Sequence, residues 1–152
     1  GIRVYQGKKL KIVRDFSGKP QAVNTPLLQL LLDNGYVPVL TVPIIDEQNA
    51  AINTENDDVV RVCQQALQAD LVINLIGAPG FLENSDDETS LIKHIAASEL
   101  EAREQQVDGR MKRKMLSVRK LFEQGASRVI IADGRLAHPV AEALAGKGTV
   151  IS

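Results

Sequence analysis

The chain has 152 residues, of which 44% are hydrophobic and 24% are charged, a composition typical of a globular protein with a buried core. Its 18 Lys and Arg residues nearly balance its 19 Asp and Glu residues, and it contains two Tyr, three Phe and no Trp. Near-neutral charge and few aromatic side chains disfavour a surface built for nucleic acid or for an anionic membrane. The apolar runs are shorter than the roughly 18 residues that cross a bilayer, and the first residues lack the apolar core of a secretory signal, so we expect a cytoplasmic protein.

The metal-binding residue types are sparse and scattered. Cys63 is the only cysteine, which excludes a disulfide framework and a cysteine-based zinc site. His94 and His138 have no carboxylate or cysteine at ligand spacing. The sequence therefore predicts no metal site made of protein ligands alone.

In chain order, the first third of the sequence predicts a hairpin, a helix and a strand. Residues 2–15 are typical of two short strands around Gly7, Lys8 and Lys9. Thr25 and Pro26 begin a helix that Gly35 ends. Residues 36–44, with the sequence YVPVLTVPI, form an apolar run rich in β-branched residues, which predicts a buried strand.

The remaining sequence alternates helical and strand patterns. Its predicted helices cover residues 56–68, 91–106, 110–124 and 138–146, and its predicted strands cover residues 70–76, 128–133 and 148–152. In the first of these helices the residues expected on the buried face are Val59, Cys63, Ala66 and Leu67. The alternation predicts a single domain over residues 1–152, an α/β fold with three α/β/α layers and a mainly parallel sheet, plus the small N-terminal β-hairpin.

Ligands of such sheets bind beyond the carboxyl ends of the strands, which directs attention to the loops after Ile44, Ile76 and Ala132. The second loop contains Gly77, Ala78, Pro79 and Gly80, small residues that let a ligand approach the main chain. The same residues also suit an ordinary turn, and both readings stay open. The sequence has neither a dinucleotide fingerprint nor a Walker A loop.

Polar residues gather where the helix at residue 56 begins. Asn53, Asn56, Asp57 and Asp58 lie within six positions of one another. Helix capping and the helix dipole explain Asn and Asp at such a start, and a binding role explains them equally well.

Four cations occupy five positions at Arg110, Lys112, Arg113 and Lys114, and the buried stripe of their helix is expected at Met111, Met115, Val118 and Phe122. At about 100° per residue, Arg113 points away from that stripe and Lys112 points sideways. Lys114 falls only about 60° from the stripe, so it is the cation best placed to enter the protein. A surface lysine with a buried stem is the alternative.

Taken in order, GYVPVLTVPI, AINTENDD, ADLVINLIGAPGFL, GRMKRK, VIIADGR and GTVIS resemble the C-terminal half of the amino acid kinase family, from about Arg3 onward. The similarity is greatest to its N-acetylglutamate kinase branch. Within that branch the sequence resembles the kinases that phosphorylate aminoadipate or glutamate held on a small, acidic amino-group carrier protein. Glu55 stands where the kinases of free acetylglutamate usually carry Asn, and Gly77 where many carry Asp.

This resemblance implies roles for particular residues. Lys114 would neutralise charge on the transferred phosphoryl group, Asp57 would orient the catalytic lysines, and Asn53 would bind the acyl-amino-acid substrate. ATP and Mg²⁺ are the implied cofactors. The segment along the adenosine of ATP would be the loop of Ile76, Gly77, Ala78, Pro79, Gly80, Phe81 and Leu82.

The resemblance also implies what the chain lacks. The N-terminal half of the family supplies the other catalytic lysine, the glycine-rich phosphate loops and much of the acyl-substrate pocket. We therefore expect little or no kinase activity from this chain alone. Free acetylglutamate as substrate, and a non-catalytic nucleotide-binding module, are the alternatives. A homodimer is possible, although family dimers depend mainly on the other half.

Overall fold

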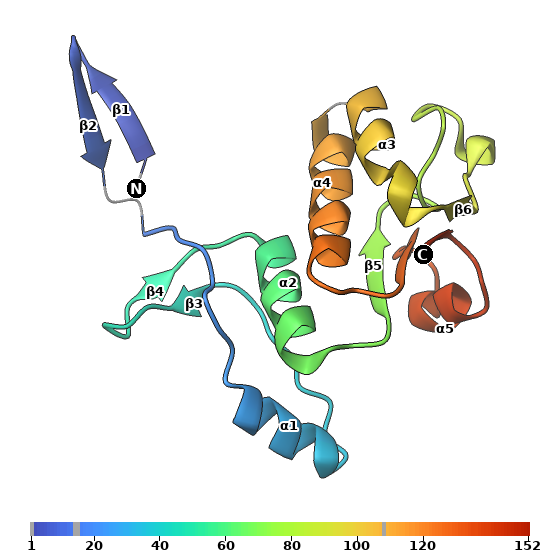
Figure 1. Cartoon of the computed structure of the whole chain (residues 1–152), viewed down its shortest axis with the longest axis horizontal. Helices are drawn as coiled ribbons and strands as arrows, with labels where there is room; N and C mark the ends of the chain where they lie inside the picture. Colours follow the sequence, from blue (N-terminus) through green and yellow to red (C-terminus); the bar gives the residue numbers. More distant parts are fainter. Residues whose placement is uncertain (1, 14–15, 108) are drawn as a thin grey trace. The chain divides into compact units, whose positions relative to one another are not determined.

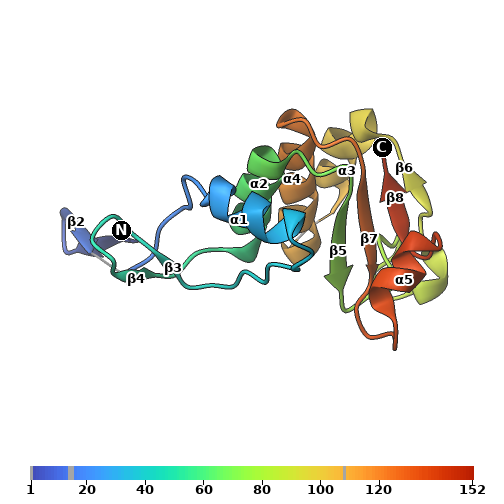
Figure 2. The ribbon, with the colours of Figure 1, turned by 90° about the horizontal axis from the view of Figure 1, so that it is seen from below.

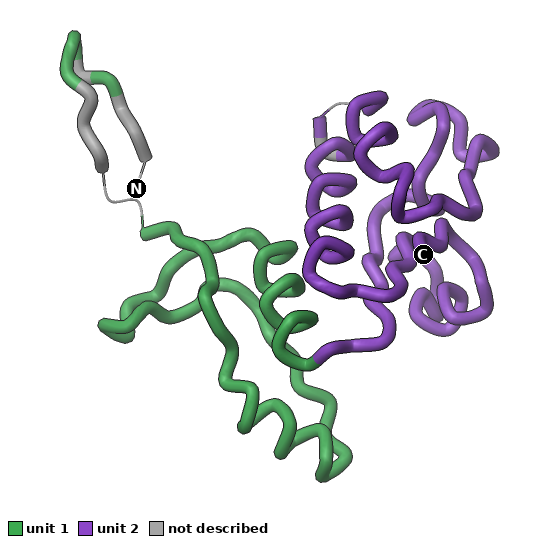
Figure 3. The backbone as a smooth tube through the Cα atoms, viewed as in Figure 1, with its two compact units in different colours: residues 1–67 green, residues 68–152 purple. Residues whose placement is uncertain are grey.

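The structure is a computed structural model that describes residues 2–13, 16–107 and 109–152 (Figure 1). The chain divides into two compact units, Gly1–Leu67 and Gln68–Ser152, which are coloured separately in Figure 3.

Unit 1 begins with the predicted hairpin, in which β1 (Ile2–Gln6) pairs antiparallel with β2 (Lys9–Val13). It also contains the helices α1 (Thr25–Asp33) and α2 (Asn56–Leu67), whose bounds agree with the predicted helices to within about one residue. The buried residues of α2 were predicted less well. Val62 and Gln64 are its buried side chains, whereas Val59, Cys63, Ala66 and Leu67 are only half-buried.

The sequence signals at both ends of α1 act as predicted. The side chain of Asn24 accepts a hydrogen bond from the backbone N–H of Leu27, and proline occupies the first turn. At the other end, the backbone N–H of Tyr36 donates to the carbonyl of Leu31 at 3.0 Å and closes the helix.

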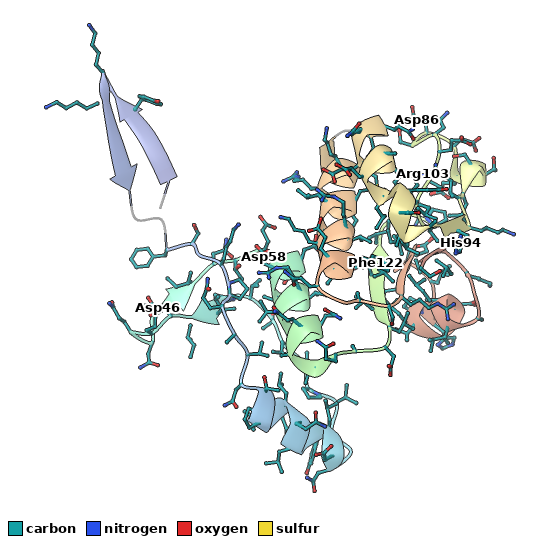
Figure 4. All side chains as sticks on the ribbon, in the orientation of Figure 1. Asp46, Asp58, Asp86, His94, Arg103 and Phe122 are labelled. Atoms are coloured by element: carbon teal, nitrogen blue, oxygen red, sulfur yellow. The ribbon has the colours of Figure 1, made fainter. Side chains whose placement is uncertain are left out.

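The predicted strand over residues 36–44 is wrong. Residues 37–43 lie outside every helix and strand, and the strand β3 is only Ile44–Ile45. It pairs antiparallel with β4 (Ala51–Ile52) across a turn in which the Asp46 carboxylate accepts from the backbone N–H groups of Gln48 and Ala50 (Figure 4). The apolar run has the right residues for a strand, but the described part of unit 1 provides no strand beside residues 37–43. The loop after Ile44 therefore does not follow a strand of the parallel sheet.

Unit 2 contains the main sheet. Its strand order is β5 (Val72–Ile76), β7 (Val129–Asp133), β8 (Thr149–Ile151) and β6 (His94–Ile95). The β5–β7 and β6–β8 pairs are parallel, and the β7–β8 pair is antiparallel. This confirms the mainly parallel sheet.

Helices cover both faces of this sheet. Figures 1 and 2 show α5 (Pro139–Leu144) on one face, and α3 (Leu100–Gln106) with α4 (Gly109–Glu123) on the other. Ala143 of α5 packs with Ile130 and Ala132 of β7. The three-layer prediction is confirmed.

The prediction of a helix from residue 91 to residue 106 is only partly correct. Strand β6 occupies His94–Ile95, the short 3₁₀ helix η2 occupies Ala97–Glu99, and α3 begins at Leu100. Residues 94–95 form a strand and not a helix because they pair with the edge of β8, where the backbone N–H of Val150 donates to the carbonyl of Lys93 at 2.9 Å. A second 3₁₀ helix, η1, spans Glu88–Ser90.

The core of unit 2 is built around β7, which lies between β5 and β8 and has a helix layer on each face. Val129 and Ile131 are fully buried, and so are Met115 and Val118 of α4 and Ile151 of β8. A strand buried on both faces reads as a continuous apolar run, and this explains why the sequence identified β7 correctly.

We expect Ile131→Ala to lower the free energy of unfolding by about 3 kcal/mol, because it removes buried methyl groups and leaves a cavity in a packed layer. Urea denaturation followed by circular dichroism measures this change. Val140→Ala, at a half-exposed position of α5, is the control and should change the value by less than about 0.5 kcal/mol. Similar losses for both variants would contradict the assignment of β7 as the centre of the core.

Candidate functional site

The carboxyl ends of β5 and β7 lie at the same edge of the sheet. Ile76 and Asp133 are opposite each other in the register, and the backbone N–H of Gly134 donates to the carbonyl of Ile76 at 2.8 Å. Two of the loops selected from sequence, those after Ile76 and after Ala132, therefore start side by side.

The amino ends of β8 and β6 meet the same edge. Because β8 runs antiparallel to β7, its first residue, Thr149, lies opposite Ile131, and β6 runs parallel to β8. The edge thus combines strand starts and strand ends. Lys93, Lys147 and Gly148 belong to this edge, and the sequence analysis did not select them.

Thr149 fixes the loop that leaves β5. The backbone N–H of Phe81 donates to the Thr149 hydroxyl oxygen at 2.8 Å, and that hydroxyl donates to the carbonyl of Ile92 at 2.6 Å. Thr149 is fully buried and Phe81 nearly so. One side chain therefore supplies partners for two main-chain groups from different segments.

Two glycines are required by close approaches around this hydroxyl. A Cβ atom on Gly80 would lie 2.7 Å from a methyl group of Leu91 and 2.8 Å from the Thr149 hydroxyl oxygen. A Cβ atom on Gly148 would lie 2.4 Å from the carbonyl oxygen of Ile131, at a φ of +119°. Gly146 and Gly148, which lie two positions apart just before Thr149, are the sequence signal that could have identified this part of the site.

A cavity of about 340 Å³ opens at this edge, near the lower limit of the 300–1,000 Å³ typical of small-molecule sites. Pro79 is the residue of the predicted loop Ile76–Leu82 that lines this cavity. The other lining residues are Leu91, Lys93, Ala132, Asp133, Leu136, Pro139, Glu142, Gly146, Lys147 and Gly148.

Charges of both signs line the cavity, and the anions have cationic partners. Lys147 Nζ lies 2.7 Å from a carboxylate oxygen of Glu142. Arg135 donates to Asp133 from its backbone N–H and Nε, both at 2.9 Å, and from its terminal guanidinium nitrogen at 2.8 Å. The same terminal nitrogen donates to Glu88 of η1 at 3.0 Å. Such a balanced lining suits a neutral molecular group better than a run of phosphates.

The hydrogen bonds between Arg135 and its carboxylate partners also shift the pKa values of Asp133 and Arg135. Its side-chain donors lower the pKa of Asp133, and the hydrogen bond from the backbone N–H acts in the same direction. The carboxylates of Asp133 and Glu88 raise the pKa of Arg135. Asp133 is therefore an anion at neutral pH and remains a hydrogen-bond acceptor in the lining of the cavity.

The basic helix α4 separates its cations as the helical geometry predicted. Lys112 and Arg113 are exposed, whereas Lys114 is half-buried beside the fully buried Met115. The side chain of Arg110 lies outside the described residues. Of the predicted stripe, Met115 and Val118 are fully buried, and Met111 and Phe122 are half-buried.

In unit 1, Asn53 and Asp57 flank the start of α2. The backbone of Asn53 pairs with the segment before α1, because its N–H donates to Phe16 and its carbonyl accepts from Gly18. Its side chain is exposed, and Asp57 is half-buried in the first turn of α2. Next to it, Asp58 makes an ion pair with Arg61 at 3.6 Å. The predicted site residues are thus divided between the units, with Asn53 and Asp57 in unit 1 and Lys114 and the loop Ile76–Leu82 in unit 2.

The described residues contain no group of three or more His, Cys, Asp or Glu side chains that could hold a metal ion. Likewise, among residues 2–13, 16–107 and 109–152, no helix is long and apolar enough to span a membrane.

A three-layer α/β domain with a ligand-sized cavity at the sheet edge defines a broad class of small-molecule-binding proteins. Within that class, residues 2–133 match the model of the amino acid kinase family, and the chain belongs to this family. It is 37% identical to the LysW-aminoadipate kinase of Thermus thermophilus, over 99% of this chain and 57% of that relative. It is 34% identical to the acetylglutamate kinase of Archaeoglobus fulgidus, over 91% of this chain and 49% of that relative.

The chain therefore spans about half the length of these curated relatives. Among solved structures, N-acetylglutamate synthase from Neisseria gonorrhoeae, in complex with coenzyme A and L-arginine, superposes with a TM-score of 0.80. That match covers 99% of this chain and 35% of the synthase chain, at 21% identity. At this identity the likeness concerns the fold.

We expect Thr149→Val to destabilise the protein by about 2 kcal/mol, although the two side chains have nearly the same shape, because the buried N–H of Phe81 and the half-buried carbonyl of Ile92 lose their partner. Chemical denaturation measures the stability, and amide hydrogen exchange at Phe81 should speed up. Thr149→Ser keeps the hydroxyl and is the rescue variant. Thr41→Val, at an exposed position, is the matched control. Unchanged exchange at Phe81 in Thr149→Val would refute the role of this hydroxyl.

Proposed function

We propose that the chain is the ATP-binding part of a kinase that phosphorylates the side-chain carboxylate of aminoadipate or glutamate held on an amino-group carrier protein. The observation that carries this proposal is the 37% identity to LysW-aminoadipate kinase along 99% of the chain, within the family match.

The cavity in unit 2 supports a binding site for the nucleoside part of ATP. Its volume of about 340 Å³ suits a nucleoside, its lining contains apolar Leu91 and Leu136, and its anions are paired with cations. Asp133 provides an ionised acceptor for a hydroxyl or amino group. The loop Ile76–Leu82, held by Thr149, is the segment we assign to the adenosine.

The phosphoryl chemistry requires positive charge more than covalent help. Phosphoryl transfer passes through a loose, anionic transition state that is stabilised mainly by positioning and by cations. We assign to Lys114 the role of a cation that stabilises this transition state. We assign to Asp57 the role of keeping the catalytic lysines charged and oriented. Asn53, with an exposed side chain, is assigned to the acyl-amino-acid substrate.

When bound, Mg²⁺ would neutralise charge on the ATP phosphates. Since the described residues offer no acidic cluster, we assign no protein ligand to this ion, which would enter as ATP·Mg²⁺.

The part of the relatives that this chain does not cover matters for activity. Because the family's second catalytic lysine and phosphate loops belong to that part, we propose that the 152-residue chain binds ATP without turning it over.

A second candidate, phosphorylation of free acetylglutamate, has support from the 34% identity to the acetylglutamate kinase of Archaeoglobus fulgidus. Assays of a polypeptide containing both halves, with carrier-bound and free substrates, distinguish the two candidates.

The nucleotide site is tested by filling the cavity. We expect Leu136→Trp, at a residue that lines it, to lower the affinity for ATP·Mg²⁺ at least tenfold in calorimetric titration. The control Leu144→Trp changes an exposed leucine of α5 that does not line the cavity, and it should leave the affinity unchanged. If the unaltered chain binds no ATP, or if both variants bind alike, the proposed function fails.

The carrier protein is tested by charge reversal on α4. Arg113 is exposed and cationic, so Arg113→Glu should weaken binding of the acidic carrier protein several-fold at low salt and much less at high salt. Arg128→Glu, at an exposed position before β7, is the matched control for net charge. Equal losses for both variants, measured by surface plasmon resonance, would show that α4 is not the docking surface.

A further inference from the structure

Asp133 places a carboxylate in the wall of the unit 2 cavity, at the carboxyl end of β7. Its side chain is only 13% exposed. The backbone at this position is fixed, because the N–H of Gly134 donates to the carbonyl of Ile76 at 2.8 Å, and Ile76 is the partner of Asp133 in the strand register. Asp133 therefore lies beside the first residue of the loop that we assign to the adenosine.

Arg135 uses only part of the hydrogen-bonding capacity of this carboxylate. Oδ1 of Asp133 accepts from the backbone N–H and from Nε of Arg135, and Oδ2 accepts from one terminal nitrogen of the same guanidinium. A carboxylate oxygen has two lone pairs, so the bonds made by the described residues leave Oδ2 able to accept one more donor. The three bonds also hold the carboxylate in one orientation, which lowers the entropy cost of binding a ligand group there.

The groups around Asp133 favour a hydroxyl donor over the amino edge of a base. In adenine the amino group lies next to a ring-nitrogen acceptor, so a site that recognises this edge needs an acceptor and a donor side by side. The nearest main-chain N–H groups, those of Gly134 and Arg135, are already bonded to the carbonyl of Ile76 and to Asp133 itself. A hydroxyl group needs the acceptor alone. Because like charges repel, the phosphates of a nucleotide lie away from this carboxylate.

We propose that Asp133 accepts a hydrogen bond from a ribose hydroxyl of the bound nucleotide, and that this contact makes the site select ribonucleotides over dideoxyribonucleotides. This inference rests on the proposed function, which places the nucleoside part of ATP in the unit 2 cavity. The apolar side chains of Leu91 and Leu136 line the same cavity and are available to the base. A hydrogen bond from a hydroxyl to a carboxylate is stronger than one between neutral groups, so its loss has a measurable effect on affinity.

The test compares ATP·Mg²⁺ with 2′,3′-dideoxy-ATP·Mg²⁺, which lacks both ribose hydroxyls, by calorimetric titration of the 152-residue chain. We expect the dideoxy compound to bind about tenfold more weakly, the effect of one charge-assisted hydrogen bond. In Asp133→Ala the two affinities should become equal. In Asp133→Asn, whose amide forms only neutral hydrogen bonds, the ratio should fall to about threefold. Both affinities are measured on the same protein, so a loss of stability leaves their ratio unchanged.

Glu88→Ala is the matched control. Glu88 bonds to the same guanidinium as Asp133, at 3.0 Å, but it does not line the cavity. Its removal deletes a carboxylate partner of Arg135 without changing the acceptor offered to the nucleotide. The preference of about tenfold for ATP over the dideoxy compound should therefore persist in this variant.

Equal affinities of the unaltered chain for ATP and for the dideoxy compound would overturn the proposal, and so would a preference that persists in Asp133→Ala. A third nucleotide, purine riboside triphosphate, lacks the amino group of adenine and keeps both hydroxyls. If this compound binds weakly to the unaltered chain and as well as ATP to Asp133→Ala, the carboxylate recognises the base and the proposal is wrong.

The outcome for the proposed function is separate. If ATP binds and Leu136→Trp weakens it, while the dideoxy compound binds as well as ATP, the nucleotide site stands and the role of Asp133 fails. If no nucleotide binds to the unaltered chain, both proposals fail.

Discussion

The hydroxyl group of Thr149 is the contact on which the ligand edge of unit 2 depends. It accepts from the backbone of Phe81 and donates to the backbone of Ile92, and thereby joins the loop after β5 to the segment before β6. Gly80 is needed because any larger residue would collide with this hydroxyl and with Leu91. Without a buried hydroxyl at this place, the buried N–H of Phe81 and the half-buried carbonyl of Ile92 would lose this partner, and protein structures avoid buried polar groups without partners.

The direction of the strands explains why the cavity is lined as it is. A purely parallel sheet would present only carboxyl ends at one edge. Here the antiparallel pairing of β7 with β8 turns the sequence around Gly148 toward that edge, and β6 follows it. Lys93 and Lys147, which precede two strand starts, consequently line the same cavity as Asp133 from a strand end, and the mixed charge of the cavity follows from topology.

The sequence predicted the elements that are specified locally. The start and end of α1, the hairpin, and the buried stripe of α4 all depend on residues within a few positions of one another. Strand β7 was recognisable because every residue from Val129 to Ala132 is buried. The failures concern tertiary pairing. Residues 37–43 have the composition of a strand but no neighbouring strand within the described residues, whereas residues 94–95 form a strand because β8 offers an edge. Propensity cannot identify a neighbour that lies more than 50 residues away.

In the candidate site, too, the sequence predicted local features and missed contacts between distant segments. Helical geometry alone predicted that Lys114 lies closer to the buried face of α4 than Arg113, and the structure agrees, since Lys114 is half-buried and Arg113 is exposed. Conversely, no sequence pattern connects Asp133 with Glu88, because Arg135, which bonds to both, is 47 positions from Glu88 in the chain. Of the residues lining the cavity, Pro79 belongs to the loop after Ile76, and Asp133 and Leu136 belong to the loop after Ala132, both of which the sequence analysis selected. Lys93, Glu142 and Lys147 were not selected, since they become neighbours of these loops only when the sheet is formed.

The hydrogen bond between Phe81 and Thr149 also affects the order of events in folding. The two residues are separated by 68 positions, so the loop cannot reach its final shape when β5 first forms. It must wait until β8 has joined the sheet, which requires closing a long stretch of chain at an entropic cost. The loop at the ligand edge is thus completed late, and during folding it remains less ordered than the strand from which it emerges.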